Sequence, residues 1–161
     1  MLDANAVISL LTDRNDEQKN AVLSVAQKSL RGENEIILHQ HVVSETIFTL
    51  LNVYGLNKGT IVQIVADLIA HPGAVSKNDL SWEDVFTLWP KTFPDIGDAI
   101  VAAVAREGSY SVFTFDIKFR RKLKSVGIHD ATEPKIREQK PGLQFLKKIR
   151  HCVQIGMLDL R

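Results

Sequence analysis

The stretch of residues 93–105 constrains the fold most, because it predicts a helix that is apolar on almost every side. Such a helix has to be buried, and its small alanine residues allow neighbouring backbone to pack closely. Asp95 and Asp98 lie at its start, where the positive end of the helix dipole tolerates carboxylates. The simplest interpretation is structural: Asp95 is the N-cap, and Asp98 occupies the reciprocal position three residues later.

The size and composition of the chain narrow the class of protein. Its 161 residues suffice for one domain with a substantial core but hardly for two. The formal net charge of +1 gives no overall positive potential that would attract nucleic acid, so nucleic-acid binding would depend on local basic patches. A single cysteine, Cys152, excludes an intrachain disulfide framework and is typical of a reducing compartment. Without a membrane-spanning run or a secretory signal, we expect a cytoplasmic protein with no membrane contact.

Strands and helices alternate along the predicted chain, which indicates parallel pairing through right-handed crossovers. The prediction is an α/β fold, a three-layer α/β/α sandwich with a small, mostly parallel sheet of about four or five strands. We expect Ile47 and Leu51 to face the core from their helix. The first strand ends at Leu2, further strands are expected over 35–38, 111–115 and 126–128 with Val75 at an edge, and helices over 15–30, 42–54, 58–70, 82–89, 95–108 and 117–124.

The composition changes after Pro134. Residues 135–141 are polar and charged, as in a linker, and an amphipathic helix is predicted over 143–160. This helix packs on its own domain, forms a dimer contact or is an artificial tail, and the sequence leaves these alternatives open. We therefore divide the chain into a domain of residues 1–134 and an extension of residues 135–161. Because the first strand is so short, we also expect the natural start to lie upstream of Met1.

Acidic residues recur at or just after the expected strand ends, or early in the helix that follows. In open α/β sheets, ligands bind beyond the carboxyl ends of the strands. Carboxylates gathered there would repel one another in a partly dry cleft, and a hard divalent cation would neutralise them. Oxygen ligands favour Mg²⁺ or Mn²⁺ over Zn²⁺. The acids in question are Asp3, Glu45, Asp98 and Asp116, with Asp95 as a fifth candidate.

Each of these acids also has a simpler interpretation. Asp3 and Asp116 are suited to be N-caps of the helices that they precede, and Glu45 to be a solvated acid in the first turn of its helix. Taken singly, these structural roles are the stronger reading. The coincidence of all the acids at one edge of the sheet favours a metal site.

Basic and imidazole side chains add two further candidates. Lys118, Arg120 and Arg121 belong to a basic helix that follows the last acid, and they form either a phosphate-binding patch or a solvated helix face. His39 and His41 flank a strand end. An alternating pair in a loop is more often unliganded, and we reject a zinc site there.

Four segments of the chain each combine a carboxylate with apolar or small residues. They are Asp3-Ala4-Asn5-Ala6-Val7-Ile8; Val43-Ser44-Glu45 with Leu50; Asp98-Ala99 with Ala102, Ala103 and Ala105; and Thr114-Phe115-Asp116 with Phe119. Taken in order, these segments resemble the four motifs of PIN domains, and the match extends from Met1 to about Pro134. The size of the chain and its Tyr54-Gly55-Leu56 turn look like the VapC-type toxins of bacterial and archaeal toxin–antitoxin pairs.

This resemblance implies a metal-dependent endoribonuclease, the toxin of a type II toxin–antitoxin pair. Its implied partners are an RNA substrate, a cognate antitoxin protein and a second copy of the chain in a homodimer. The main alternative is a non-catalytic PIN-like module that binds RNA or protein. In the implied site, Asp3, Glu45, Asp98 and Asp116 hold Mg²⁺ or Mn²⁺ with Asp95 at the periphery, Asn5 and Thr114 orient carboxylates or water, and Lys118, Arg120 and Arg121 contact RNA.

Overall fold

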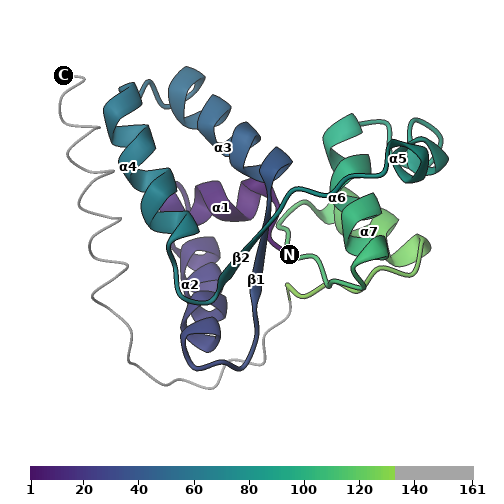
Figure 1. The fold of residues 1–161 in the computed structure, drawn as a ribbon, viewed down its shortest axis with the longest axis horizontal. Coiled ribbons are helices and arrows are strands. Elements are labelled where there is room, and N and C mark those ends of the chain that lie inside the picture. Colours follow the sequence, from purple (N-terminus) through teal and green to yellow (C-terminus); the bar gives the residue numbers. More distant parts are fainter. Residues whose placement is uncertain (133–161) are drawn as a thin grey trace.

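Two parallel strands form the regular part of the sheet in the computed structural model, which describes residues 1–132 (Figure 1). Strand β1 (Ile36–His39) pairs with β2 (Ala74–Lys77), so that Ile36 lies opposite Ala74 and His39 opposite Lys77. Every residue of β1 is buried, whereas β2 is partly exposed. The predicted edge strand around Val75 is therefore confirmed, and β1 is an inner strand.

Three short segments continue the row of parallel strands beyond β1. The Leu2 N–H donates to the Ile37 carbonyl at 3.1 Å, and Leu2 forms a parallel bridge with Phe113. Val112 forms a second parallel bridge with Asp130. In space the row runs β2, β1, Leu2, Phe113 and Asp130, which confirms a small parallel sheet within an α/β fold.

Two of the expected strands differ from the structure. Residues 111–115 form only isolated bridges, at Val112 and Phe113, because each neighbouring segment pairs over a single residue. The strand expected over 126–128 is wrong: Val126 caps the end of the preceding helix, and Gly127 turns the chain with a φ of +78°. Pairing resumes only at Asp130.

Helices lie on both sides of the strands (Figure 1). The first side carries helices α1 to α4, in which α1 packs against α2 and α3, and α3 against α4. The second side carries α5 to α7, in which α5 packs against α6. Their bounds are α1 (Ala4–Leu11), α2 (Asp16–Leu30), α3 (Gln40–Asn52), α4 (Lys58–Ile69), α5 (Trp82–Leu88), α6 (Ile96–Glu107) and α7 (Ile117–Ser125).

Helix α6 is buried as its composition predicts, with every residue from Ala99 to Ala105 in the core. It begins after the N-cap Asp95 and ends at Gly108. The loop before it inserts Phe93 into the core, where its ring meets that of Phe119 from α7 edge to face at 5.7 Å. Both rings are almost inaccessible to solvent, so this contact fixes α7 beside the start of α6.

Helix α3 starts earlier than predicted, and this shifts its faces. The His39 side chain accepts a hydrogen bond from the His41 N–H at 3.3 Å and so caps a helix that begins at Gln40. Glu45 therefore lies beyond the first turn, contrary to the prediction. The core face consists of Val42, Thr46 and Leu50, spaced four apart. Ile47 and Leu51 are partly exposed, so their predicted core positions are wrong.

Some predictions fall outside what the structure describes. The domain boundary at residue 134 and the helix expected over 143–160 both lie beyond residue 132. Within residues 1–132, no helix combines the length and the apolar character that a membrane crossing requires.

Candidate functional site

Helix starts hold three of the predicted acids near the carboxyl ends of the parallel row. Asp3 follows Leu2 directly, and its Oδ1 accepts a hydrogen bond from the Ala6 N–H at 2.7 Å. Asp95 precedes α6 and Asp116 precedes α7 in the same way. Each of these N-caps satisfies backbone N–H groups that have no partner inside the helix.

The predicted capping roles are confirmed, and each uses a single carboxylate oxygen. Oδ1 of Asp95 accepts from the N–H groups of Gly97 and Asp98 at 2.8 and 3.1 Å. Oδ1 of Asp116 accepts from those of Lys118 and Phe119 at 2.7 and 3.0 Å. A carboxylate has two oxygens, so capping a helix and binding a cation are compatible roles for one side chain.

Asp3 is the most deeply placed acid, with 6% of its surface exposed. Burial raises its pKa from 3.8 to about 6, hydrogen bonds from Thr114 and Ala6 oppose the shift, and the charges of Glu45 and Asp116 add to it. Desolvation disfavours the charged form of a carboxyl group, and nearby negative charges do the same. The Asp3 carboxyl group therefore loses its proton about two pH units higher than an ordinary aspartate.

Asp98 and Glu45 respond to the same surroundings from other elements. Burial raises the pKa of Asp98 to about 6; the charges of Asp95, Asp116 and Asp3 raise it further, and Lys122 lowers it. Burial also raises the pKa of Glu45, which His41 lowers and Asp95 raises.

The five acids therefore lie within reach of one another's charges, although they come from four separate parts of the chain. Asp3 is buried, Asp98 is intermediate and the other three are exposed, so the group extends from the interior to the surface. Within residues 1–132, no three Asp, Glu, His or Cys side chains are close enough as they stand to hold a metal ion. The site is an open arrangement of repelling carboxylates rather than a closed cage.

Comparison with known families shows to which family the chain belongs. The family model of the PIN domain matches residues 1–124. The chain belongs to the PIN domain family. PIN domains are generally nucleases, act on RNA or other nucleic acid and typically use divalent metals. No curated protein matches the chain.

The two polar residues expected beside the five acids, Thr114 and Asn5, take different positions. Thr114 is buried; its hydroxyl hydrogen-bonds the Asp3 carboxylate and accepts from the Asp116 N–H at 3.1 Å. It thus links two of the acids. Asn5 lies on the exposed side of α1, and its carbonyl accepts from the Ser9 hydroxyl. In the described residues, no hydrogen bond of the Asn5 side chain to an acid is observed.

The basic residues of α7 divide into two groups. Lys118 and Arg121 are exposed in the helix that Asp116 caps. Arg120 instead pairs with the buried carboxylate of Asp130, so it joins α7 to the last segment of the parallel row. Lys122 is close enough to lower the pKa of Asp98.

From the sequence His41 is weighed only as a zinc ligand and rejected, whereas the structure places it among the acids. Its Nε2 lies 3.7 Å from Oε2 of Glu45, one turn along α3. The only signal was its spacing, because residues four apart on a helix are neighbours.

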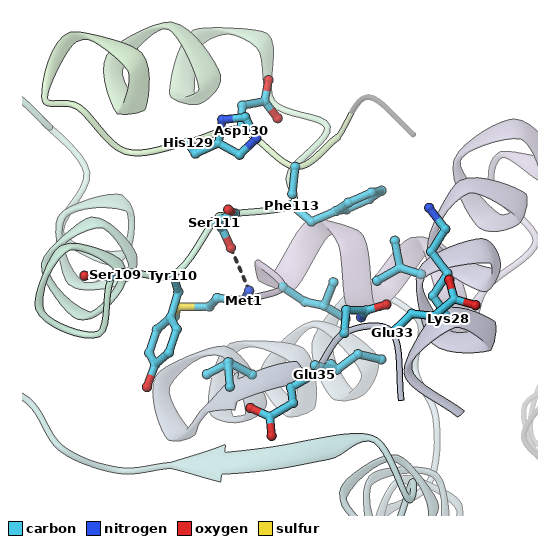
Figure 2. Close-up of a pocket in the computed structure, with 16 residues that line it drawn as sticks. Met1, Lys28, Glu33, Glu35, Ser109, Tyr110, Ser111, Phe113, His129 and Asp130 are labelled. Carbon is cyan, nitrogen blue, oxygen red and sulfur yellow. Dashed lines mark hydrogen bonds between the residues drawn. The ribbon is translucent and has the colours of Figure 1, made fainter. Parts of the chain in front are cut away.

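A cavity of about 660 Å³ lies at the opposite end of the parallel row, at the amino ends of the strands (Figure 2). Its lining includes Met1, Glu35 and Asp130. Figure 2 shows the Met1 ammonium donating to the Ser111 carbonyl, at 2.7 Å. None of the five acids described above lines this cavity.

Proposed function

We propose that this PIN domain is a metal-dependent endoribonuclease and the toxin of a type II toxin–antitoxin pair. The observation that carries the proposal is the gathering of acids at one edge of the sheet, where burial, with repulsion between the acids adding to it, raises the pKa of Asp3 and Asp98 to about 6. A fold that keeps such repulsion needs a compensating positive charge, and Lys122 alone lowers the pKa of Asp98 too little to cancel it.

The donor set fits a hard divalent cation. All the candidate ligands are carboxylate oxygens, which Mg²⁺ and Mn²⁺ prefer, and the capping acids keep a second oxygen outside the cap. When bound, the ion would supply an activated water and positive charge at the scissile phosphate. The residues that would hold it are Asp3, Glu45, Asp98 and Asp116, with Asp95 at the periphery.

Other side chains of the site orient these acids or offer positive charge to the RNA. Thr114 fixes the Asp3 carboxylate through a hydrogen bond and, through the Asp116 N–H, the turn that carries Asp116. Lys118 and Arg121 offer exposed positive charge to phosphates next to the acids. The resemblance to PIN nucleases implies products with a 5′-phosphate and a 3′-hydroxyl.

Cleavage of total cellular RNA tests the activity. We expect cleavage with Mg²⁺ or Mn²⁺, none in a chelator, and recovery when the ion is restored. Asp98→Asn should abolish cleavage because it removes a charged ligand while changing the shape of the side chain little. Thermal melts of both proteins control for folding. Full cleavage by this variant, or cleavage undiminished in the chelator, would contradict the proposal.

The toxin role extends to partners. The support is the Tyr54-Gly55-Leu56 turn and the chain length, which resemble VapC-type toxins. Expression of the chain alone should arrest growth, and co-expression of a small protein encoded next to it should relieve the arrest. Light scattering should give the mass of a homodimer; growth that continues during expression of the intact protein counts against the toxin role.

One observation favours a second candidate, a non-catalytic module that binds RNA or protein. The described acids do not form a ready-made group of three ligands. Calorimetry with Mn²⁺ separates the two candidates, since a nuclease should bind the ion and lose affinity in Asp116→Ala. A protein that binds RNA but takes up no Mn²⁺ would favour the module.

A further inference from the structure

The Nε2 atom of His41 is buried and has no hydrogen-bond partner among the described residues. Its nearest carboxylate oxygen, Oε2 of Glu45, is 3.7 Å away, which is too long for a hydrogen bond. Buried polar atoms are almost always satisfied, so an exception at the edge of a site calls for a functional explanation.

Gly97 shows how closely this imidazole approaches the first turn of α6. A Cβ atom added to Gly97 would lie 2.9 Å from His41 Nε2 and 3.0 Å from Asp95 Oδ1. The first distance is shorter than real Cβ atoms show, and the second is tighter than most of their contacts, so a methyl group here would push the imidazole aside. The glycine therefore leaves room for the imidazole on one side and the capping carboxylate on the other.

His41 consequently lies between acids that belong to different helices. Glu45 is on α3, one turn after His41, and Asp95 caps α6, against which α3 packs. Besides burial, which raises the pKa of Glu45, the charge of His41 lowers it and that of Asp95 raises it, so Glu45 interacts with both groups. An N–H donor at this point can hold the Glu45 carboxylate toward the start of α6.

We propose that His41 is a positioning residue that ties Glu45 to the first turn of α6, and that Gly97 provides the room for its ring. The inference rests on the proposed nuclease function, in which Glu45 is a ligand of the ion. It needs only an N–H donor at this place and does not depend on protonation of the ring. Residues behind ligands act by fixing ligand orientation, and their loss typically weakens metal binding about 10- to 100-fold.

Two substitutions of His41 separate hydrogen bonding from packing. His41→Gln keeps an N–H donor near the position of Nε2, whereas His41→Leu fills similar space without one. Calorimetric titration with Mn²⁺ measures binding directly, and steady-state cleavage of a fixed RNA gives kcat and KM. We expect His41→Leu to weaken Mn²⁺ binding about tenfold or more and to lower kcat with KM unchanged, and His41→Gln to stay within about threefold of wild type.

A pair of glycine substitutions tests the space around the ring. Gly97 and Gly59 are each the second residue of a helix that follows an Asx cap, Asp95 in one case and Asn57 in the other. Gly97→Ala should reproduce the loss seen in His41→Leu. Gly59→Ala should behave as wild type, because its Cβ would approach only Asn57 Oδ1, at 3.4 Å.

The outcomes distinguish this inference from the function on which it rests. Wild-type Mn²⁺ affinity in His41→Leu, or an equal loss in His41→Gln, would show that the ring only packs, and would overturn the inference alone. A wild-type protein that neither binds Mn²⁺ nor cleaves RNA would overturn the proposed function and the inference with it. Thermal melts of all four variants confirm that each is folded.

Discussion

The two ends of the parallel row carry acidic residues in opposite electrostatic settings. At the carboxyl end, Asp3 is buried among other acids, and its pKa is raised to about 6. At the amino end, Asp130 is about as deeply buried, but hydrogen bonds from Thr132 and the charge of Arg120 hold its pKa below the usual value despite desolvation. Similar solvent exposure of two carboxyl groups therefore does not mean the same pKa shift, because the depth of the surrounding protein and the charged partner together decide which protonation state is favoured.

This contrast shows what marks a site for a cation. The amino end holds a defined cavity of about 660 Å³, but there Asp130 is paired with Arg120, and the Met1 ammonium is bonded to Ser111. At the carboxyl end, the negative charges of the acids add to the rise in pKa that burial causes. Unbalanced charge, rather than cavity size, distinguishes the edge that we assign to metal and RNA.

The largest difference between the two ends should appear in catalysis. Asp116→Asn keeps an oxygen that can cap α7 but removes one negative charge from the site, and we expect kcat to fall at least about 100-fold. Glu35→Gln, in the lining of the cavity, should leave kcat unchanged. Cleavage of one labelled RNA under saturating Mg²⁺ measures kcat of both variants. A similar fall in kcat for the two would contradict the assignment of catalysis to the carboxyl end alone.

Stability should change in opposite directions when the two buried acids lose their charge. A raised pKa means that the folded state binds the proton more tightly than the unfolded state, so metal-free stability falls as the pH rises from about 4 to 6. Asp3→Asn should therefore stabilise the metal-free protein at pH 8, by up to about 3 kcal/mol for a shift of this size.

Asp130→Asn is the matched comparison. Because the pKa of Asp130 is lowered, its stabilising effect is present at neutral pH and is lost as the pH falls through the folded pKa. The variant should lose about 1 to 3 kcal/mol at pH 8. Urea unfolding in chelator at pH 4 and pH 8 measures all three proteins, and two shifts of the same sign would refute the contrast.

Metal affinity should depend on pH at the acidic edge. Asp3 and Asp98 have to lose their protons before they bind an ion, and both have a pKa of about 6. We expect Mn²⁺ affinity to fall by about tenfold or more from pH 7.5 to pH 5 and to level off above pH 7. Calorimetry in buffers of different ionisation enthalpy should show proton release near pH 6; affinity independent of pH would exclude these two ligands.

The smallest effect should come from the exposed basic residues. Lys118→Ala with Arg121→Ala should raise KM for RNA about three- to tenfold at unchanged kcat and make it less sensitive to salt, because fewer phosphate contacts release fewer counterions. Lys28→Ala, beside the cavity, is the control. A salt dependence equal to that of wild type would assign Lys118 and Arg121 to a solvated helix face.

Local sequence signals predicted much of the fold because they depend on neighbours along the chain. The apolar composition of α6 predicted its burial, and the Asp residues before α1, α6 and α7 predicted the N-caps. The predicted length of the strand over 111–115 was wrong, because strand length depends on how many residues the neighbouring segments offer for pairing. Here Leu2 and Asp130 each offer one.

The site was predictable only in part for a similar reason. Acids after strand ends could be expected at one edge, since parallel strands end together. The start of α3 depended on a side-chain cap by His39, so the turn that holds Glu45 was misplaced. The contact of His41 with Gly97 joins residues far apart in the chain, and no periodicity reports it.

One further feature is the bond between Thr132 and Thr114. The Thr132 hydroxyl donates to the Thr114 carbonyl at 2.7 Å and accepts from its N–H at 3.2 Å, while the Thr132 N–H donates to Asp130. These three hydrogen bonds stabilise the turn that places Thr114 between Asp3 and Asp116. Truncation for laboratory work should therefore keep Thr132, because a shorter protein would lose the brace behind its own carboxylates.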